Sequence, residues 1–196
     1  MRAHFLMQKT TDRIRLNLGC GERCLPGYLN VDKFGKPDVL FDLETFPWPW
    51  DDGSVQEIML SHVLEHLGQT TEIYFSIIKE LYRICMPGAY IYIVAPHPRH
   101  DSFINDPTHV RAVTPDGLQL FSKAKNREWL EKGLANSPLG LDLDVDFEIV
   151  TVKVILDSVW EKKRITGQLT EDQIDEAINK YNNVAENIQI VLRAIK

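Results

Sequence analysis

The sequence has few cysteines and no long apolar segment. Its three cysteines, Cys20, Cys24 and Cys85, are an odd number without a paired spacing, which indicates a reducing compartment. No apolar run approaches the roughly 18 residues that a membrane-spanning helix needs. The first thirteen residues contain too short an apolar stretch for a signal peptide. We therefore expect a cytoplasmic protein without a membrane partner.

Positive charge is also in short supply. The 196 residues include 22 lysines and arginines against 28 aspartates and glutamates, a formal net charge of −6. This balance argues against a broad nucleic-acid-binding surface, so we expect no nucleic-acid partner. Repeats and low-complexity segments are absent as well. The length suits one domain, which we expect to span residues 1–196.

Short apolar runs bounded by glycine, proline or aspartate predict seven β-strands. Several are apolar at both odd and even positions, which is typical of strands buried on both faces of a parallel sheet. Between them, residues 71–85 carry a helical apolar stripe that Pro87-Gly88 should end, and Thr114 and Thr170 should cap two further helices. The expected strands are Ile14–Leu18, Tyr28–Val31, Val39–Phe41, Val55–Leu60, Tyr90–Val94, Phe147–Leu156 and Ile188–Ile195.

Strands that alternate with helices predict an α/β fold. The last two strands are separated by an insertion of about thirty residues that holds a helix. A connection of this kind does not require a parallel crossover. We therefore expect the last strand to pair antiparallel with its predecessor at the sheet edge.

The stretch LNLGCGERCLPGYLNVD leads from a buried strand to two glycines and an aspartate. Gly19-Cys20-Gly21 follows the strand directly, where open α/β sheets bind ligands, and glycines let a backbone approach a ligand closely. Asp32 ends the neighbouring strand at the same edge, where a carboxylate can accept both hydroxyls of a ribose. The third glycine of a dinucleotide fingerprint and the Gly-Lys-Ser/Thr of a Walker A loop are both missing. The pattern favours a nucleoside ligand without phosphates.

Four segments in this order resemble the class I S-adenosylmethionine-dependent methyltransferases, in particular the small-molecule type with a His-x-Leu-Glu-His segment after the fourth strand. The segments are LNLGCGERCLPGYLNVD, FDLETFPWPWDDGS, LSHVLEHL and ELYRICMPGAYIYIVAP, and the resemblance covers residues 14–96. It implies a Rossmann-like, mostly parallel seven-stranded sheet with an antiparallel last strand. It also implies S-adenosyl-L-methionine as cofactor and methyl transfer to an oxygen or nitrogen of a small-molecule acceptor.

The resemblance also assigns cofactor contacts to the ends of the first four strands. The Gly-Cys-Gly turn would line the methionine and ribose, and Asp32 would hold the ribose hydroxyls. The two residues after the third strand would contact the adenine, and those after the fourth would face the sulfonium and the acceptor. Plain turn or capping roles stay open for the glycines and both aspartates. The implied cofactor set is Gly19, Cys20, Gly21, Asp32, Asp42, Leu43, Ser61 and His62.

Two connections are shorter than the resemblance leads one to expect. Six residues separate Gly21 from Tyr28, and Asp32 to Val39 is equally short, whereas a parallel crossover normally takes about a dozen residues or more. The helices after the first two strands are therefore expected to be reduced. One sheet face would be thinly covered, and a second copy of the chain could pack there as a homodimer.

The segment His62-Val63-Leu64-Glu65-His66 also matches H-x-x-E-H, the inverted zincin signature. In that alternative, a zinc hydrolase, the two histidines would bind zinc and Glu65 would act as base. The signature belongs in a long helix, however, and Gly68 breaks this one almost at once. We expect no metal site here, and none from His100, Asp106 and His109.

The polar segment APHPRHDSFINDPTHVRAVTP follows the fifth strand and should lie over the methyl group of the cofactor. Within the domain we expect a tail (1–13), a cofactor-binding half (14–96), a substrate and lid region (97–146) and C-terminal strands with a helical insertion (147–196). The histidines could orient an acceptor or take its proton, because their ordinary pKa near 6.5 suits that task. They could also only build the loop, and an inactive methyltransferase-like binding module is the second hypothesis. The candidate catalytic residues are His62, His100, Asp106 and His109.

Overall fold

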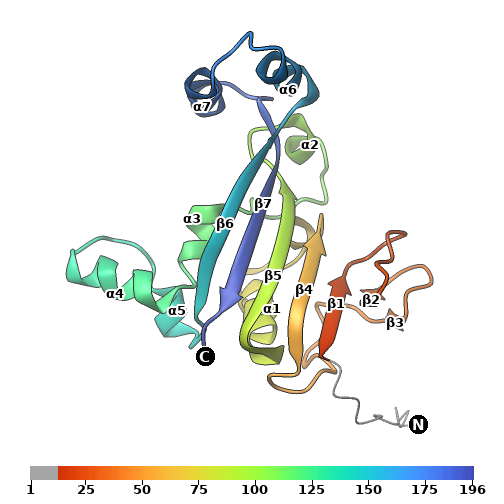
Figure 1. Cartoon of the computed structure of the whole chain (residues 1–196). Coiled ribbons are helices and arrows are strands. Elements are labelled where there is room, and N and C mark those ends of the chain that lie inside the picture. Colours follow the sequence, from red (N-terminus) through yellow and green to blue (C-terminus); the bar gives the residue numbers. More distant parts are fainter. Residues whose placement is uncertain (1–12) are drawn as a thin grey trace.

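The computed structural model describes residues 13–196, and its seven strands form one sheet. Their order is β3-β2-β1-β4-β5-β7-β6; neighbours from β3 to β5 pair parallel, and β7 is antiparallel to both β5 and β6 (Figure 1). The Rossmann-like α/β fold and the antiparallel pairing of the last two strands are confirmed, with β6 as the edge strand. The strands are β1 (Ile14–Leu18), β2 (Leu29–Asp32), β3 (Val39–Leu40), β4 (Val55–Ser61), β5 (Cys85–Pro96), β6 (Phe147–Leu156) and β7 (Ala185–Ala194).

The helices begin at the residues that their capping signals indicate. Thr70 and Thr114 accept hydrogen bonds from backbone N–H groups in the first turns that follow them, and Thr170 forms a full capping box with Gln173. None of the described helices is long and apolar enough to cross a membrane. The helices are η1, a 3₁₀ helix (Leu64–His66), α1 (Thr71–Ile84), α2 (Asp101–Ile104), α3 (Pro115–Gln119), α4 (Lys123–Glu131), α5 (Leu139–Asp142), α6 (Ser158–Ile165) and α7 (Glu171–Lys180).

The prediction that Pro87-Gly88 ends the helix was wrong. Helix α1 ends at Ile84, and Cys85 already has extended backbone and pairs with Val55 of β4. The proline and glycine therefore lie within β5, next to an irregularity in its pairing with β4, where a strand tolerates them.

Helices cover one face of the sheet. Helices α1 and α3 lie behind the sheet in Figure 1, and no helix is seen across the face toward the viewer. Strand β5 alternates accordingly, with Ile91 and Ile93 buried while Tyr90 is 38% exposed. The prediction that strands are buried on both faces was therefore wrong for this strand. The reduced connections are confirmed, because no helix lies between β1 and β2 or between β2 and β3.

Buried asparagines hold the short β1–β2 connection in place of a helix. The Asn17 side chain donates to the carbonyl of Arg23 and to Asn30 Oδ1, each at 2.9 Å, and Asn30 Oδ1 also accepts the N–H of Leu25 at 2.7 Å. Asp38 accepts both the backbone and the side-chain N–H of Asn30, which holds the pKa of Asp38 below its usual value. The loop is thus attached to β1, β2 and the start of β3.

The loop between β3 and β4 is attached to the C-terminal end of α1. Arg83 donates to the carbonyls of Trp48 and Trp50 at 3.1 and 2.9 Å, and Glu80 accepts the N–H of Trp48 at 2.6 Å. A hydrogen bond from Arg83 holds the pKa of Glu80 below its usual value. Both tryptophans are buried, so this contact fixes the segment that follows Asp42.

Replacing Arg83 by alanine is expected to lower the free energy of unfolding by about 1–3 kcal/mol, because buried carbonyls and Glu80 lose charged hydrogen bonds. Urea denaturation measures the change. Arg193→Ala is the matched control, since Arg193 pairs with Glu148 on the exposed sheet face and should contribute little. Equal losses in the two variants would contradict the anchoring of this loop by Arg83.

Candidate functional site

The turn after β1 needs glycine at both positions, for different reasons. Gly19 and Gly21 have φ values of +66° and +51°, a region that side chains disfavour. A Cβ on Gly19 would lie 2.5 Å from a methyl carbon of Val63, so the turn packs tightly against the segment after β4. A Cβ on Gly21 would meet nothing within 4 Å. The backbone at Gly21 therefore borders open space.

Asp32, at the end of β2, holds this turn. One carboxylate oxygen accepts the N–H of Gly21 at 2.8 Å and the other accepts the N–H of Phe34 at 2.9 Å. The side chain is half-buried and lines a cleft. Each carboxylate oxygen has two lone pairs, so Asp32 can accept further hydrogen bonds from a ligand.

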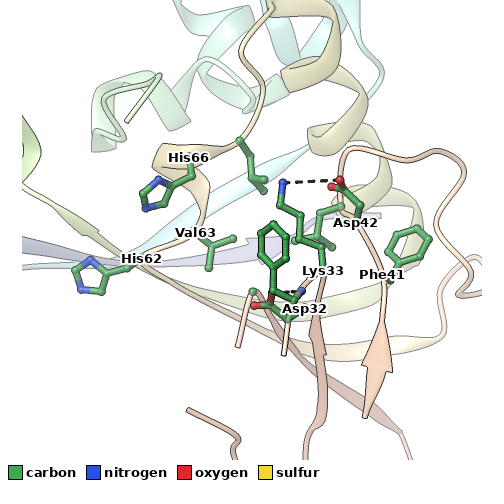
Figure 2. A pocket seen from close by; sticks show the side chains of 11 residues that line it. Asp32, Lys33, Phe41, Asp42, His62, Val63 and His66 are labelled. Atoms are coloured by element: carbon green, nitrogen blue, oxygen red, sulfur yellow. Dashed lines mark hydrogen bonds and ion pairs between the residues drawn. The ribbon is translucent and has the colours of Figure 1, made fainter. Parts of the chain in front are cut away.

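The segment after β3 forms the opposite wall. Asp42 accepts the N–H of Glu44 at 3.0 Å, and its other carboxylate oxygen lies 3.8 Å from Lys33 Nζ (Figure 2). Leu43 is buried, and its carbonyl accepts the indole N–H of Trp48 at 3.0 Å. This wall thus combines an apolar side chain with a half-exposed carboxylate.

These elements surround a cleft at the carboxyl ends of the strands that is open to solvent. The cleft brings together five members of the predicted cofactor set: Gly19, Asp32, Asp42, Leu43 and His62. Three members are not among the lining residues: Ser61 ends β4, Cys20 is buried within the turn, and Gly21 follows it. Burial raises the pKa of the Cys20 thiol to about 11, helped by Cys24 and Asp32. Lining residues outside the predicted cofactor set are Lys33, Phe34, Phe41, Val63, His66 and Leu67.

Phe34 is the most conspicuous of these unpredicted residues. Its side chain is 70% exposed, although it is large and apolar. It follows the carboxylate at the end of β2 by two residues and borders the same cleft as Leu43. An aromatic residue just after the acidic one was a signal that the sequence did offer.

His62 leaves β4 in a left-handed backbone conformation, with φ of +57°. Its N–H donates to the carbonyl of Val94 at 2.8 Å, and its Nδ1 lies 3.5 Å from a carboxylate oxygen of Glu65. Figure 2 shows the imidazoles of His62 and His66 on the far side of Val63 from Asp42. Only the three-residue helix η1 follows, so the long helix of a zincin is absent from this part of the described chain.

The segment after β5 brings two of its predicted residues to η1. The rings of His66 and His109 have centroids 4.6 Å apart, and Asp106 Oδ2 lies 3.8 Å from His109 Nε2. His100 is placed differently: it caps α2 by accepting the N–H of Ser102, and its Nε2 lies 3.8 Å from Asp157 Oδ2. His62, Asp106 and His109 thus border one region, whereas His100 faces the C-terminal insertion.

The chain is similar to known proteins in its fold. No family model matches it, and no curated protein does. Among solved structures, a SAM-dependent methyltransferase from Archaeoglobus fulgidus is 20% identical, with a TM-score of 0.60. That match covers 92% of this chain and 86% of the other.

Two further solved structures resemble the chain over most of its length. A SAM-dependent methyltransferase from Methanosarcina mazei is 14% identical, with a TM-score of 0.51 and coverage of 95% and 94%. The 1,6-didemethyltoxoflavin-N1-methyltransferase of Burkholderia thailandensis, solved with 1,6-didemethyltoxoflavin and S-adenosylhomocysteine, is 10% identical. Its TM-score is 0.51, and 93% of this chain and 71% of that chain are covered. The chain therefore has the fold of these methyltransferases.

Gly19→Ala is expected to destabilise the protein more than Gly21→Ala. Both changes place a side chain at positive φ, which costs about 1–2 kcal/mol, but only the first also forces a methyl group against Val63, for about 1–3 kcal/mol more. Urea denaturation of both variants measures the difference. Gly27→Ala, at φ +78° with open space around it, controls for the backbone effect. Equal losses at Gly19 and Gly21 would mean that the turn does not depend on its contact with Val63.

Proposed function

We propose that this chain is a methyltransferase that binds S-adenosyl-L-methionine in the cleft between β1, β2, β3 and η1. The observation that carries the proposal is the joint position of the glycine turn, Asp32 and Asp42 around one cleft, on a fold that solved methyltransferases share. The residues present suit the parts of this cofactor. The bare backbone of Gly19 lines the cleft, and the methionine portion can approach it there.

The remaining contacts follow from the chemistry of the lining. Asp32 would accept the ribose hydroxyls with its free lone pairs. Phe34 and Leu43 offer apolar surfaces for a flat base, and Asp42 offers an acceptor for the exocyclic amine of adenine. The exposure of Phe34 is then explained, because a large apolar side chain at a cleft suits a ligand.

When bound, S-adenosylmethionine supplies a methyl group on a positively charged sulfur, which an acceptor atom displaces in line. Most of the rate then comes from holding the acceptor near the methyl group, so the task of the protein is positioning. His62 and His66 border the cleft on the side away from Asp42, and the ring of His109 lies next to that of His66. We assign these histidines to acceptor binding and proton removal, with Asp106 supporting them. His100 has no contact with this group and is left out of the assignment.

We propose a small-molecule acceptor, methylated on oxygen or nitrogen, and a cytoplasmic location. The net charge of −6 disfavours a polynucleotide, and the three free cysteines suit a reducing compartment. The helix-free sheet face supports a second candidate, a binding module that keeps the cofactor and acts through a partner. A second copy of the chain on that face is the partner we expect. The aromatic side chain of Tyr90 is exposed on that face and is compatible with a contact to a second copy.

S-adenosylhomocysteine at one hundred times its dissociation constant is expected to stabilise the fold by about 2.7 kcal/mol. For a chain of this size that corresponds to a rise of roughly 5–10 °C in melting temperature. Asp32→Asn should remove most of this rise, because the amide cannot accept hydrogen bonds from the turn and from both hydroxyls as a carboxylate does. Asp142→Asn, on the exposed surface of α5, makes the same chemical change away from the cleft and should keep the rise. A wild-type protein without any rise at millimolar ligand would refute cofactor binding.

Methyl transfer separates the enzyme from the binding module. With S-adenosylmethionine labelled in its methyl group, we expect label in at least one member of a panel of phenols, aliphatic alcohols, amines and short RNA. His62→Gln should lower the rate by about 10²–10⁴-fold if His62 removes the proton, while leaving S-adenosylhomocysteine binding within about threefold. Normal binding of the cofactor without transfer to any of these acceptors would favour the binding module.

A further inference from the structure

Glu65 has an unusual environment for an ionisable side chain. It is 1% exposed, and neither of its carboxylate oxygens has a hydrogen-bond partner. A buried carboxylate without a donor is costly, because neither water nor protein compensates its charge. No hydrogen bond or ion pair joins it to Arg111, which is close in space through its backbone: the guanidinium donates to the carbonyl of Gly68 and lies 3.9 Å from the centre of the Tyr74 ring, and its Nε also has no partner. His62 Nδ1 lies 3.5 Å from one carboxylate oxygen, which is too long for a hydrogen bond, so Glu65 needs a further partner.

Two further histidines lie next to this carboxylate. One donor atom each from Glu65, His66 and His109 can be chosen such that all three lie within 4.8 Å of one another. His109 is almost fully buried, with 7% of its side chain exposed, and its ring stacks on Phe103. The backbone N–H of Val110 donates to the carbonyl of Glu65 at 2.9 Å, which fixes the segment after β5 onto η1.

The hydrogen bonds around both imidazoles leave the same nitrogen free. His109 Nδ1 lies 2.8 Å from the carbonyl oxygen of Phe103, which can only accept, so Nδ1 carries the hydrogen. His66 Nδ1 lies 3.0 Å from Thr108 Oγ1, and that hydroxyl donates to Asp106 Oδ1 at 2.6 Å. The hydroxyl therefore accepts from His66 Nδ1. In the neutral rings, both Nε2 atoms are left with a lone pair.

This is the arrangement that metal-binding histidines have. A ligating histidine almost always donates its other ring N–H to a carbonyl, a carboxylate or another polar group, which orients the ring and fixes its tautomer. Two imidazole nitrogens and a carboxylate oxygen suit first-row divalent cations such as Zn²⁺, Mn²⁺, Fe²⁺ and Co²⁺. Metal–ligand distances of about 2.0–2.2 Å place the donor atoms closer to one another than the 4.8 Å seen here. Each side chain must therefore move toward the common centre by less than about 1 Å.

We propose that Glu65, His66 and His109 form a binding site for a divalent transition-metal ion. The cation would neutralise the buried carboxylate and use the two free Nε2 atoms. This set differs from both groups that the sequence suggested and rejected, because it joins two residues of η1 to one from the distant loop. Asp106 Oδ2, 3.8 Å from His109 Nε2, is positioned to become a further ligand.

The position of the metal site indicates which acceptor the proposed methyl transfer uses, and this part of the proposal rests on the proposed function. His66 borders the cleft, so a cation held by it would lie where the acceptor has to approach. An acceptor hydroxyl bound to the cation would lose its proton more readily, and His62 can take that proton, because His66 and His109 would then serve as ligands. Its oxygen then forms a bond to the methyl carbon, the carbon–sulfur bond breaks, and the electron pair of that bond stays on sulfur. The products are a methyl ether and S-adenosylhomocysteine, so the acceptor class is an alcohol or phenol.

Calorimetric titration of the chelator-treated full-length chain with ZnCl₂ and with MnCl₂ tests the site. We expect one cation per chain with a micromolar or tighter dissociation constant for at least one metal. Glu65→Gln and His109→Gln should each weaken binding by at least 100-fold. His100→Gln is the matched control, because it removes a histidine of the same segment that faces Asp157, and it should bind as wild type does. Circular dichroism without metal verifies that each variant is folded, and two separate ligand variants keep the test valid if one fails to fold.

The outcomes are distinct. Binding weaker than millimolar for both metals, or binding that the Glu65 and His109 variants leave unchanged, would overturn the site. Metal binding without any response to S-adenosylhomocysteine would uphold the site and refute the proposed function. Methyl transfer to an alcohol or phenol that survives chelation unchanged would overturn the catalytic use of the cation, as would transfer to amines alone.

Discussion

The position of the glycine turn depends on the carboxylate of Asp32. No helix lies between β1 and β2 in the described chain, so the turn cannot pack against one. Asp32 accepts the N–H of Gly21 from the neighbouring strand, while Val63 packs against Gly19 from the other side. The walls of the cleft are therefore set by one charged hydrogen bond and one steric contact. Behind them, the buried amides of Asn17 and Asn30 hold the rest of the short connection.

The sheet face without helices results from the same short connections between strands. Connections of a few residues return to the next parallel strand without room for a helix, and the face they cross stays open. The apolar stripe of α1 packs on the opposite face, where Ile77, Leu81 and Ile84 are fully buried. Polar and aromatic side chains occupy the open face instead, among them Tyr28 and Glu57, which share a hydrogen bond. This explains how a sheet with one covered face keeps its other face in water.

The second organising contact lies between η1 and the segment after β5. The carbonyl of Glu65 accepts the N–H groups of Val110 and Arg111, at 2.9 and 3.2 Å. Together with the stacked ring of His109, these bonds hold polar side chains beside the cleft without a helix of their own. The arrangement leaves the Glu65 carboxylate unsatisfied in the described structure, which a fold rarely retains without a use.

The sequence by itself determined the strands, the starts of α1, α3 and α7, and the edge at which the cleft lies. These features depend on neighbours a few residues apart: the apolar run ending at Gly19, the threonine caps, and Asp32 at the end of β2. The sequence also predicted five of the eleven residues that line the cleft, since the carboxyl ends of parallel strands meet at one edge.

Only the tertiary structure decided which histidines meet. His100 and His109 stand nine positions apart in one polar segment, and nothing local tells which of them turns toward η1. The choice depends on bonds to residues far away along the chain, from His66 to Thr108 and from Asp101 to Asn183. Glu65 was equally ambiguous, because burial of a carboxylate results from the packing of all the elements around it. Local sequence patterns determine which chemistry a side chain offers, whereas contacts between distant segments determine which other side chains it meets.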